Sequence, residues 1–532
     1  MFNKKNITLY TIGLVIILSS SCTKNFQSIN TTPGLPSDIT VGPLVNGVLS
    51  TLVLRGQEQT AVHNEWYYPV TQLAATSGSS GYVLANGAQD IWNDYYSALQ
   101  NLNLALDKID ASTGDQQDLK NIRAIVYILR AYKTFRVTDQ FGDIPYFDAG
   151  KAYSGDASKY RPKYDAQQLI YDSLLANLKW AVTNISTSAS VSISSSETLF
   201  GGNMTKWLSF ANSLRLRYAM QMVEKDAATA TSVISDVLNG SAPLIADGGD
   251  VGLSPTLIPN TSLGDADWVR PWSFSSHKFM RISSTFWNIV ADGTTTASIF
   301  DPRALIFAET NQAGSWAPFV IGSNASDNAN PYNTNVRDTA INNKDNSLFS
   351  SFNYYLIRDQ YYIPEFIMNS AEVHFLKAEA YARGLGVTQN AATAEAEYIA
   401  GITASVNFWY NIAHNTNTTH DDWAAVAPAT PTAAQMTALL TNPKVAFTGV
   451  MASDLNKIYA QEWLDNFRQP WLAFNLWRRT GSTPTIGIPA TYASFYRLPY
   501  PQIESVNNTE NYNTQVKNMG GNTSAIKVWW MK

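Results

Sequence analysis

Apolar residues recur at helical spacing in pairs of segments along most of this chain. In residues 122–135 the apolar positions advance by three or four residues at a time, and the same spacing returns in residues 204–223. Such steps place side chains on one face of an α-helix. We therefore predict four helix pairs, at about residues 88–141, 165–225, 366–410 and 450–480.

Local signals mark where several of these helices begin and end. Gly142 and Gly384 follow two of the apolar stripes and predict helix C-termini. Asp165 and Gln168 form a capping-box pattern, which predicts that a helix begins beside them. Trp207 opens another stripe and is predicted to lie in a helix–helix seam. Small and large residues alternate on these faces, which lets antiparallel helices approach closely, as in tetratricopeptide arrays.

The character of the chain changes between the second and third pairs, in residues 240–363. This insertion has few helical windows, is rich in Asn, Ser, Gly and Asp, and carries many aromatic rings. A loop region of this length inside a compact protein is usually functional. A single ring there is more readily explained as part of a satellite core, but we interpret the region as a whole as a binding face.

Five rings are the best candidates for contact with a ligand. Trp316 and Tyr332 lie in Asn-, Ser- and Gly-rich stretches, where a buried helical seam is not expected. Trp268 and Trp272 flank Arg270, which could donate hydrogen bonds beside two ring faces. Tyr82 follows a Ser- and Gly-rich loop that does not need a ring for packing. The predicted ligand-binding residues are therefore Tyr82, Trp268, Trp272, Trp316 and Tyr332.

Composition narrows the class of ligand. Of the 532 residues, 45% are hydrophobic and only 15% charged, and the net charge is −5. The chain therefore has enough apolar surface for a large core but no basic surplus to neutralise phosphates, so nucleic acid is not an expected partner. Aromatic residues make up 12% of the chain. A neutral, aromatic, Asn-rich chain suits sugars better than ions.

The first residues read as a targeting segment. Lys4 and Lys5 precede an apolar run at residues 7–18, which is too short to span a bilayer as a helix. Three serines then lead to Cys22, the one cysteine of the chain. This arrangement resembles a bacterial lipobox, so we predict a lipoprotein signal peptide at residues 1–21, a lipid anchor on Cys22 and a tether at residues 22–40. The alternative is an ordinary secretory signal with an incidental cysteine.

Signatures of catalysis are missing from the sequence. There is no His-Glu-X-X-His motif, no Gly-X-Ser-X-Gly elbow and no phosphate-binding Gly loop. His414 and His420 lie near Asp421 and Asp422, but a solvated polar loop explains them better than a metal site. We therefore predict no catalytic residue, no metal site and no cofactor, and we do not expect an enzyme.

Several runs resemble a known family when they are taken together in order. Trp92 and Tyr96 come first, followed by Arg130. The remaining runs are Phe-Gly-Asp-Ile-Pro-Tyr at 141–146, Phe-Ala-Asn-Ser-Leu-Arg-Leu-Arg at 210–217, Asp-Pro-Arg at 301–303, Ala-Glu-Val at 371–373, Arg-Arg-Thr-Gly at 478–481 and Arg-Leu-Pro-Tyr-Pro at 497–501. The chain after Cys22 resembles the SusD/RagB-like outer-membrane lipoproteins of Bacteroidetes nutrient uptake.

The resemblance implies a mostly α fold for residues 41–532. Four tetratricopeptide-like antiparallel helix pairs would form a curved scaffold beside a large irregular, loop-rich ligand-binding half. The motif residues would be mostly scaffold, with Arg130, Arg215 and Arg217 holding helix termini and neighbouring carboxylates. The resemblance also implies a surface-exposed protein, anchored to the outer membrane, that works with a SusC-like TonB-dependent transporter.

The function this implies is the capture of oligosaccharide and its delivery to that transporter. An aromatic ring can cover the C–H face of a sugar while Asn, Gln and Arg groups bind its hydroxyls. One alternative is the binding of a peptide or another nutrient by the same importer lid. A surface glycoside hydrolase is a third and less favoured alternative.

Overall fold

The computed structural model describes residues 40–54, 56–253, 276–337, 343–358, 365–415, 423–485 and 487–532. The chain divides into two units, residues 1–40 and residues 41–532. The first unit, with the predicted signal peptide, tether and Cys22, lies outside the described residues except for Thr40. Everything below concerns the second unit.

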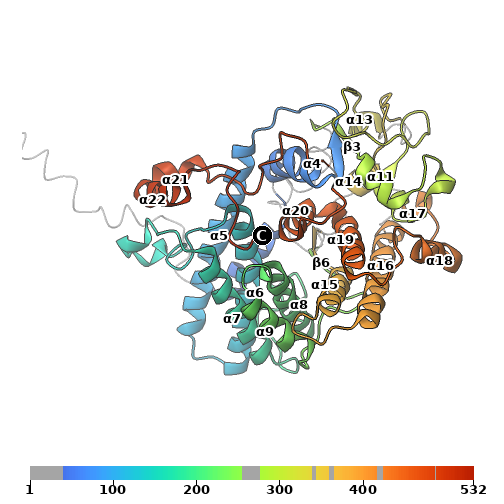
Figure 1. Ribbon diagram of the computed structural model, residues 1–532. Coiled ribbons are helices and arrows are strands. Elements are labelled where there is room, and N and C mark those ends of the chain that lie inside the picture. Colours follow the sequence, from blue (N-terminus) through green and yellow to red (C-terminus); the bar gives the residue numbers. More distant parts are fainter. Residues whose placement is uncertain are drawn as a thin grey trace, which may run out of the picture. The chain divides into compact units, whose positions relative to one another are not determined.

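The first two helix pairs are present as predicted (Figure 1). Helices α5 (Leu84–Asp110) and α6 (Gln116–Phe141) form the first pair, and α7 (Gln167–Asn184) and α8 (Met204–Met222) form the second. Each of these helices packs against the next one in sequence, and α9 (Ala227–Leu238) packs on α8. Gly142 ends α6 at φ 79°, a left-handed backbone angle that favours glycine.

The third and fourth pairs are also present. Helix α15 (Ser370–Arg383) packs against α16 (Ala391–His414), and α19 (Met451–Asp465) packs against both α15 and α20 (Pro470–Thr480). Gly384 ends α15 with φ 69°, as the sequence predicted. The prediction of a mostly α fold built from helix pairs is therefore confirmed.

Shorter helices complete the scaffold. Before the first pair come α3 (Val41–Leu49), the π-helix η2 (Glu58–Tyr67) and α4 (Tyr68–Thr71). Helices α17 (Trp423–Val426) and α18 (Ala433–Thr441) connect the third pair to the fourth. After the fourth pair, α21 (Gln502–Asn507) and α22 (Thr509–Met519) pack against each other, and α21 contacts α5.

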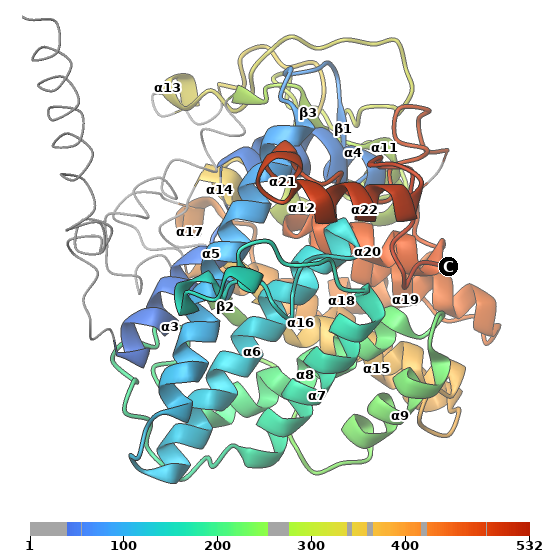
Figure 2. The same cartoon turned by 90° about the vertical axis from the view of Figure 1, so that its left-hand side faces the viewer.

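The described part of the insertion holds short strands and helices, and two of its strands pair with strands outside it, β1 and β6. Three two-stranded antiparallel sheets pair β1 (Ala74–Thr76) with β3 (Met280–Ile282), β2 (Val251–Leu253) with β6 (Glu365–Met368), and β4 (Ala308–Glu309) with β5 (Ser351–Phe352). The helices are α11 (Ser284–Val290), α12 (Ala304–Phe307), α13 (Thr334–Arg337) and α14 (Tyr354–Arg358). In Figure 2, β1 and β3 lie side by side, with α4 and α11 close by.

The predicted start of α7 is wrong in its detail. Asp165 does not cap the helix. Its Oδ2 accepts hydrogen bonds from the backbone amides of Tyr146 and Phe147, at 2.8 and 2.9 Å. Asp143, more than twenty residues upstream, accepts the amide of Gln167 at 2.8 Å instead. A contact that the tertiary fold supplies has therefore replaced the local cap.

Ion pairs join the helices where the family-like motifs occur. Arg217 of α8 bonds the carboxylate of Glu372 on α15 through two nitrogens, and Arg215 bonds Asp236 on α9. These two arginines hold neighbouring carboxylates, as expected. Arg130 does not; its guanidinium lies 5.1 Å from the ring centroid of Tyr127, and no ion pair to a described residue forms.

Candidate functional site

Residues 77–83 connect β1 to α5 and carry Tyr82, which is partly exposed; the other two predicted rings among the described residues, Trp316 and Tyr332, are buried. The loop is fixed at its first residue. The amide of Ser77 donates to the carbonyl oxygen of Phe279 at 2.9 Å, and its hydroxyl donates to the carbonyl oxygen of Asp327 at 2.9 Å. Both acceptors belong to the insertion, so the β1–α5 loop and the insertion form one surface.

Gly78 follows Ser77 in this loop. A Cβ placed on Gly78 would lie 2.7 Å from the ring of Phe279, so a larger residue here would require that ring to shift. Two residues further on, the amide of Ser80 donates to Oε1 of Glu65 at 3.2 Å. The same Glu65 oxygen lies 3.1 Å from Nε2 of the buried His277. Contacts with η2 and with the insertion thus hold the loop on both sides of Gly78.

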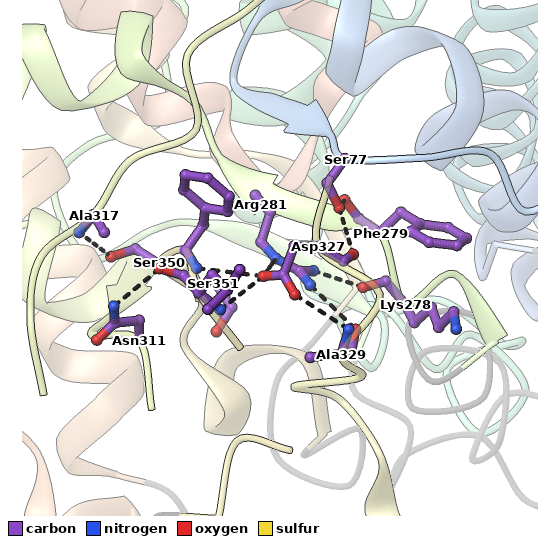
Figure 3. A network of polar contacts seen from close by, with 12 residues as sticks. Ser77, Lys278, Phe279, Arg281, Asn311, Ala317, Asp327, Ala329, Ser350 and Ser351 are labelled. Carbon is purple, nitrogen blue, oxygen red and sulfur yellow. Dashed lines mark hydrogen bonds and ion pairs between the residues drawn. The ribbon is translucent and has the colours of Figure 1, made fainter. Parts of the chain in front are cut away.

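A buried ion pair stabilises the insertion beneath this loop (Figure 3). Nε of Arg281 donates to Oδ2 of Asp327 at 3.0 Å, and both side chains are almost completely buried. Arg281 also donates to the carbonyl oxygens of Lys278 and Ala329, at 2.6 and 3.1 Å. Because the pair lies next to the Ser77 anchor, it fixes the position of the loop that carries Tyr82.

The protonation of Asp327 follows from the same contacts. Burial opposes its ionisation, but the hydrogen bond and the positive charge of Arg281 outweigh burial and lower the pKa of the carboxyl. The amides of Ala329 and Leu348 also donate to it, at 3.1 and 2.9 Å. The carboxylate is therefore ionised at neutral pH and serves as a structural hub.

The structure contradicts the expected exposure of two predicted rings. Tyr332 is 1% exposed, and its hydroxyl donates to the carbonyl oxygen of Met280 at 2.7 Å. Trp316 is 8% exposed and stacks on Trp287 with ring centroids 4.8 Å apart, while its Nε1 donates to Thr296. Both rings belong to the hydrophobic core, so their polar sequence neighbours were misleading. Their proposed role as stacking surfaces is not retained.

Trp268 and Trp272 lie outside the described residues, and their predicted role stays a prediction.

The structure brings forward other rings that sequence reasoning missed. Phe279, beside Gly78, is partly exposed. Tyr492 is also partly exposed and lies near Glu65; burial, followed by the charge of Glu65, raises its pKa to about 12. No local sequence signal singles out either ring.

The described residues form neither a metal-binding group nor a membrane-spanning helix. No group of three or more His, Cys, Asp or Glu residues there is placed to hold a metal ion. None of the described helices is long and apolar enough to cross a membrane.

Comparison with known proteins identifies the family. A family model described as "Starch-binding associating with outer membrane" matches residues 33–501. The chain belongs to the SusD-like family. No functionally curated protein matches the sequence.

Solved SusD-like structures share the fold over nearly the whole chain. A SusD homologue from Parabacteroides distasonis is 19% identical, with a TM-score of 0.68, and the match covers 93% of this chain and 98% of the homologue. A chitin-binding SusD homologue from Flavobacterium johnsoniae is 21% identical, with a TM-score of 0.66, 92% of this chain covered and 98% of the other. A third structure, of a chitin-binding protein, has a TM-score of 0.69 at 22% identity and covers 93% and 100%. At these identities the similarity shows the SusD-like fold.

Proposed function

We propose that this SusD-like protein captures oligosaccharide at the cell surface through the face that carries Tyr82. The observation that carries the proposal is the partly exposed ring of Tyr82 on a loop that η2 and the insertion hold in place. A loop that is held in place before binding loses little conformational entropy when a sugar stacks on its ring. The description of the family as starch-binding supports the same ligand class.

The partner in this proposal is a SusC-like TonB-dependent transporter, which receives the captured oligosaccharide. The lipid anchor is Cys22, and Trp268 and Trp272 are proposed as further ligand contacts. The family's association with the outer membrane supports this placement. Co-purification of a TonB-dependent transporter with the full-length protein from outer membranes tests the partnership.

Binding without cleavage is part of the proposal. Affinity electrophoresis in gels that contain soluble starch, glycol chitin, xylan or mannan tests it, with a random peptide library measured in parallel. We expect retardation by at least one polysaccharide and no release of reducing ends during incubation. Binding of peptides alone would favour the alternative in which the same importer lid binds a peptide or another nutrient. Release of reducing ends would indicate a glycoside hydrolase.

A further inference from the structure

A cavity of about 510 Å³ lies away from the residues that hold the Tyr82 loop. It lies between the C-terminal half of α16 and a segment that includes Asp247 and Asp250. Helix α16 contributes Ala404, Asn407, Phe408, Tyr410, Asn411 and His414 to the lining. Ala404, Asn407, Asn411 and His414 follow each other at steps of three or four residues, so these four share one face of the helix. The volume is in the range of small-ligand sites, about 300–1,000 Å³.

Three polar side chains that line this cavity keep hydrogen-bonding capacity in the folded protein. Among the described residues, the side chain of Asn407 forms no hydrogen bond, and that of Asn411 only accepts one, from Asn415. The carboxylate of Asp250 accepts bonds from the amide and hydroxyl of Ser370 through Oδ1, at 2.8 and 3.2 Å, which leaves Oδ2. Burial raises the pKa of Asp250, and these bonds from Ser370 oppose the shift.

One wall of the cavity is a fixed aromatic ring. Phe408 is partly exposed, and edge contacts hold it against Phe366 and Trp409, with ring centroids 5.1 Å apart in both cases. Its orientation is thus set before any ligand arrives. A partly exposed ring next to free carboxamides offers an apolar face and hydrogen-bonding groups at the same time.

The opposite wall is also held in place. Oδ1 of Asp247 lies 3.2 Å from Nε2 of His374, and Nδ1 of the same ring lies 2.6 Å from Oε2 of Glu397. This chain of contacts connects the segment with Asp247 to α15 and α16. Because both walls are fixed, binding requires little reorganisation.

We infer that this cavity is a second saccharide site, which takes one pyranose unit with its C–H face on Phe408 and its hydroxyls on Asn407, Asn411 and Asp250. Carboxamides donate and accept hydrogen bonds, as adjacent sugar hydroxyls require, and a carboxylate accepts two more. A metal ion does not suit the cavity, because no described group of three His, Cys, Asp or Glu residues could hold one. The inference rests on the lining of this cavity and not on the Tyr82 face.

The test uses calorimetry with maltotriose, triacetylchitotriose, xylotriose and mannotriose on the purified full-length protein. Tyr82→Ala serves as the background, because it weakens binding at the first face. Adding Asn407→Ala and Asn411→Ala should weaken binding of at least one of these sugars about tenfold or more. Both residues are exposed on a helix where Ala is favourable, so the melting temperature should not fall.

Asn288→Ala is the matched control, because Asn288 is an exposed asparagine on α11 outside the cavity. It should leave every affinity unchanged. The inference is overturned if the Tyr82→Ala protein binds none of the four sugars. It is also overturned if Asn407→Ala with Asn411→Ala changes no affinity. Equal affinities of Tyr82→Ala and wild type would contradict the first site and leave this inference standing, so the two proposals fail separately.

Discussion

Arg217 and Glu372 join the second helix pair to the third through a two-point ion pair. Nε and Nη2 of Arg217 each lie 2.5 Å from a carboxylate oxygen of Glu372, and both side chains are buried. Nη2 also donates to the carbonyl oxygen of Ile367 at 2.9 Å. The two residues are 155 positions apart in the chain, so this contact fixes the relative position of α8 and α15.

Arg217→Met should destabilise the protein by about 3–5 kcal/mol, because it leaves the carboxylate of Glu372 buried and unpaired. Adding Glu372→Leu removes that charge and should restore much of the lost stability. Arg123→Met, which breaks an exposed pair with Asp110, is the control and should cost less than about 1 kcal/mol. Chemical denaturation measures all three variants. Equal costs for Arg217→Met and Arg123→Met would contradict the role of this pair.

Trp207 tests the packing of α8 against the segment that precedes it. The side chain is fully buried against Phe200 and Phe210, and its Nε1 donates to Oε2 of Glu197 at 3.0 Å. Trp207→Ala removes the ring and leaves Glu197 without that donor, so it should cost about 3–5 kcal/mol. Thermal unfolding measures the change. A melting temperature equal to that of the wild type would show that this seam does not stabilise the fold.

The buried carboxyl of Glu462 makes the stability of the folded protein depend on pH. Burial, together with the nearby Glu379, Glu372 and Asp465, raises its pKa to about 8 despite the opposing charge of Arg479. A folded-state pKa above the unfolded value of about 4.3 means that the folded state holds a proton that the unfolded state has lost. The stability from this proton is complete below about pH 4 and is lost as the pH rises through 8.

Glu462→Gln mimics the protonated side chain at every pH. Its melting temperature should match that of the wild type near pH 4.5 and exceed it progressively up to pH 8.5. Glu395→Gln, an exposed change on α16, is the control and should show a flat difference. A constant difference between Glu462→Gln and wild type across this range would mean that the buried carboxyl is not protonated at neutral pH.

Cys22 tests the proposed attachment to the membrane. Cys22→Ala removes the thiol that would be acylated, so the variant should leave the outer-membrane fraction and lose labelling by a radioactive fatty acid. Fractionation of the expressing cells and immunoblotting measure this. Ser21→Ala, a conservative change beside it, should stay anchored. Retention and lipid labelling of Cys22→Ala at the wild-type level would contradict the anchor.

The scaffold could be predicted from the sequence because its signals are local. The apolar steps in residues 122–135 and the glycines after α6 and α15 depend only on helix geometry. The surface could not be predicted in the same way. Trp316 packs on Trp287, and Tyr332 bonds Met280, so distant residues decide the burial of both rings. Asp165 shows the same limit, because its carboxylate accepts hydrogen bonds from two backbone amides that only the tertiary fold brings close.

The most direct test of the proposed function is the calorimetric affinity of Tyr82→Ala for the same four trisaccharides, compared with wild type. Loss of a stacking ring should cost about 2 kcal/mol for the tightest-binding sugar, roughly a thirtyfold loss of affinity, with the melting temperature unchanged. Tyr160→Ala, which removes a ring that is 57% exposed elsewhere on the surface, should bind like wild type. Equal affinities of Tyr82→Ala and wild type for every sugar, or no binding by wild type, would contradict the account.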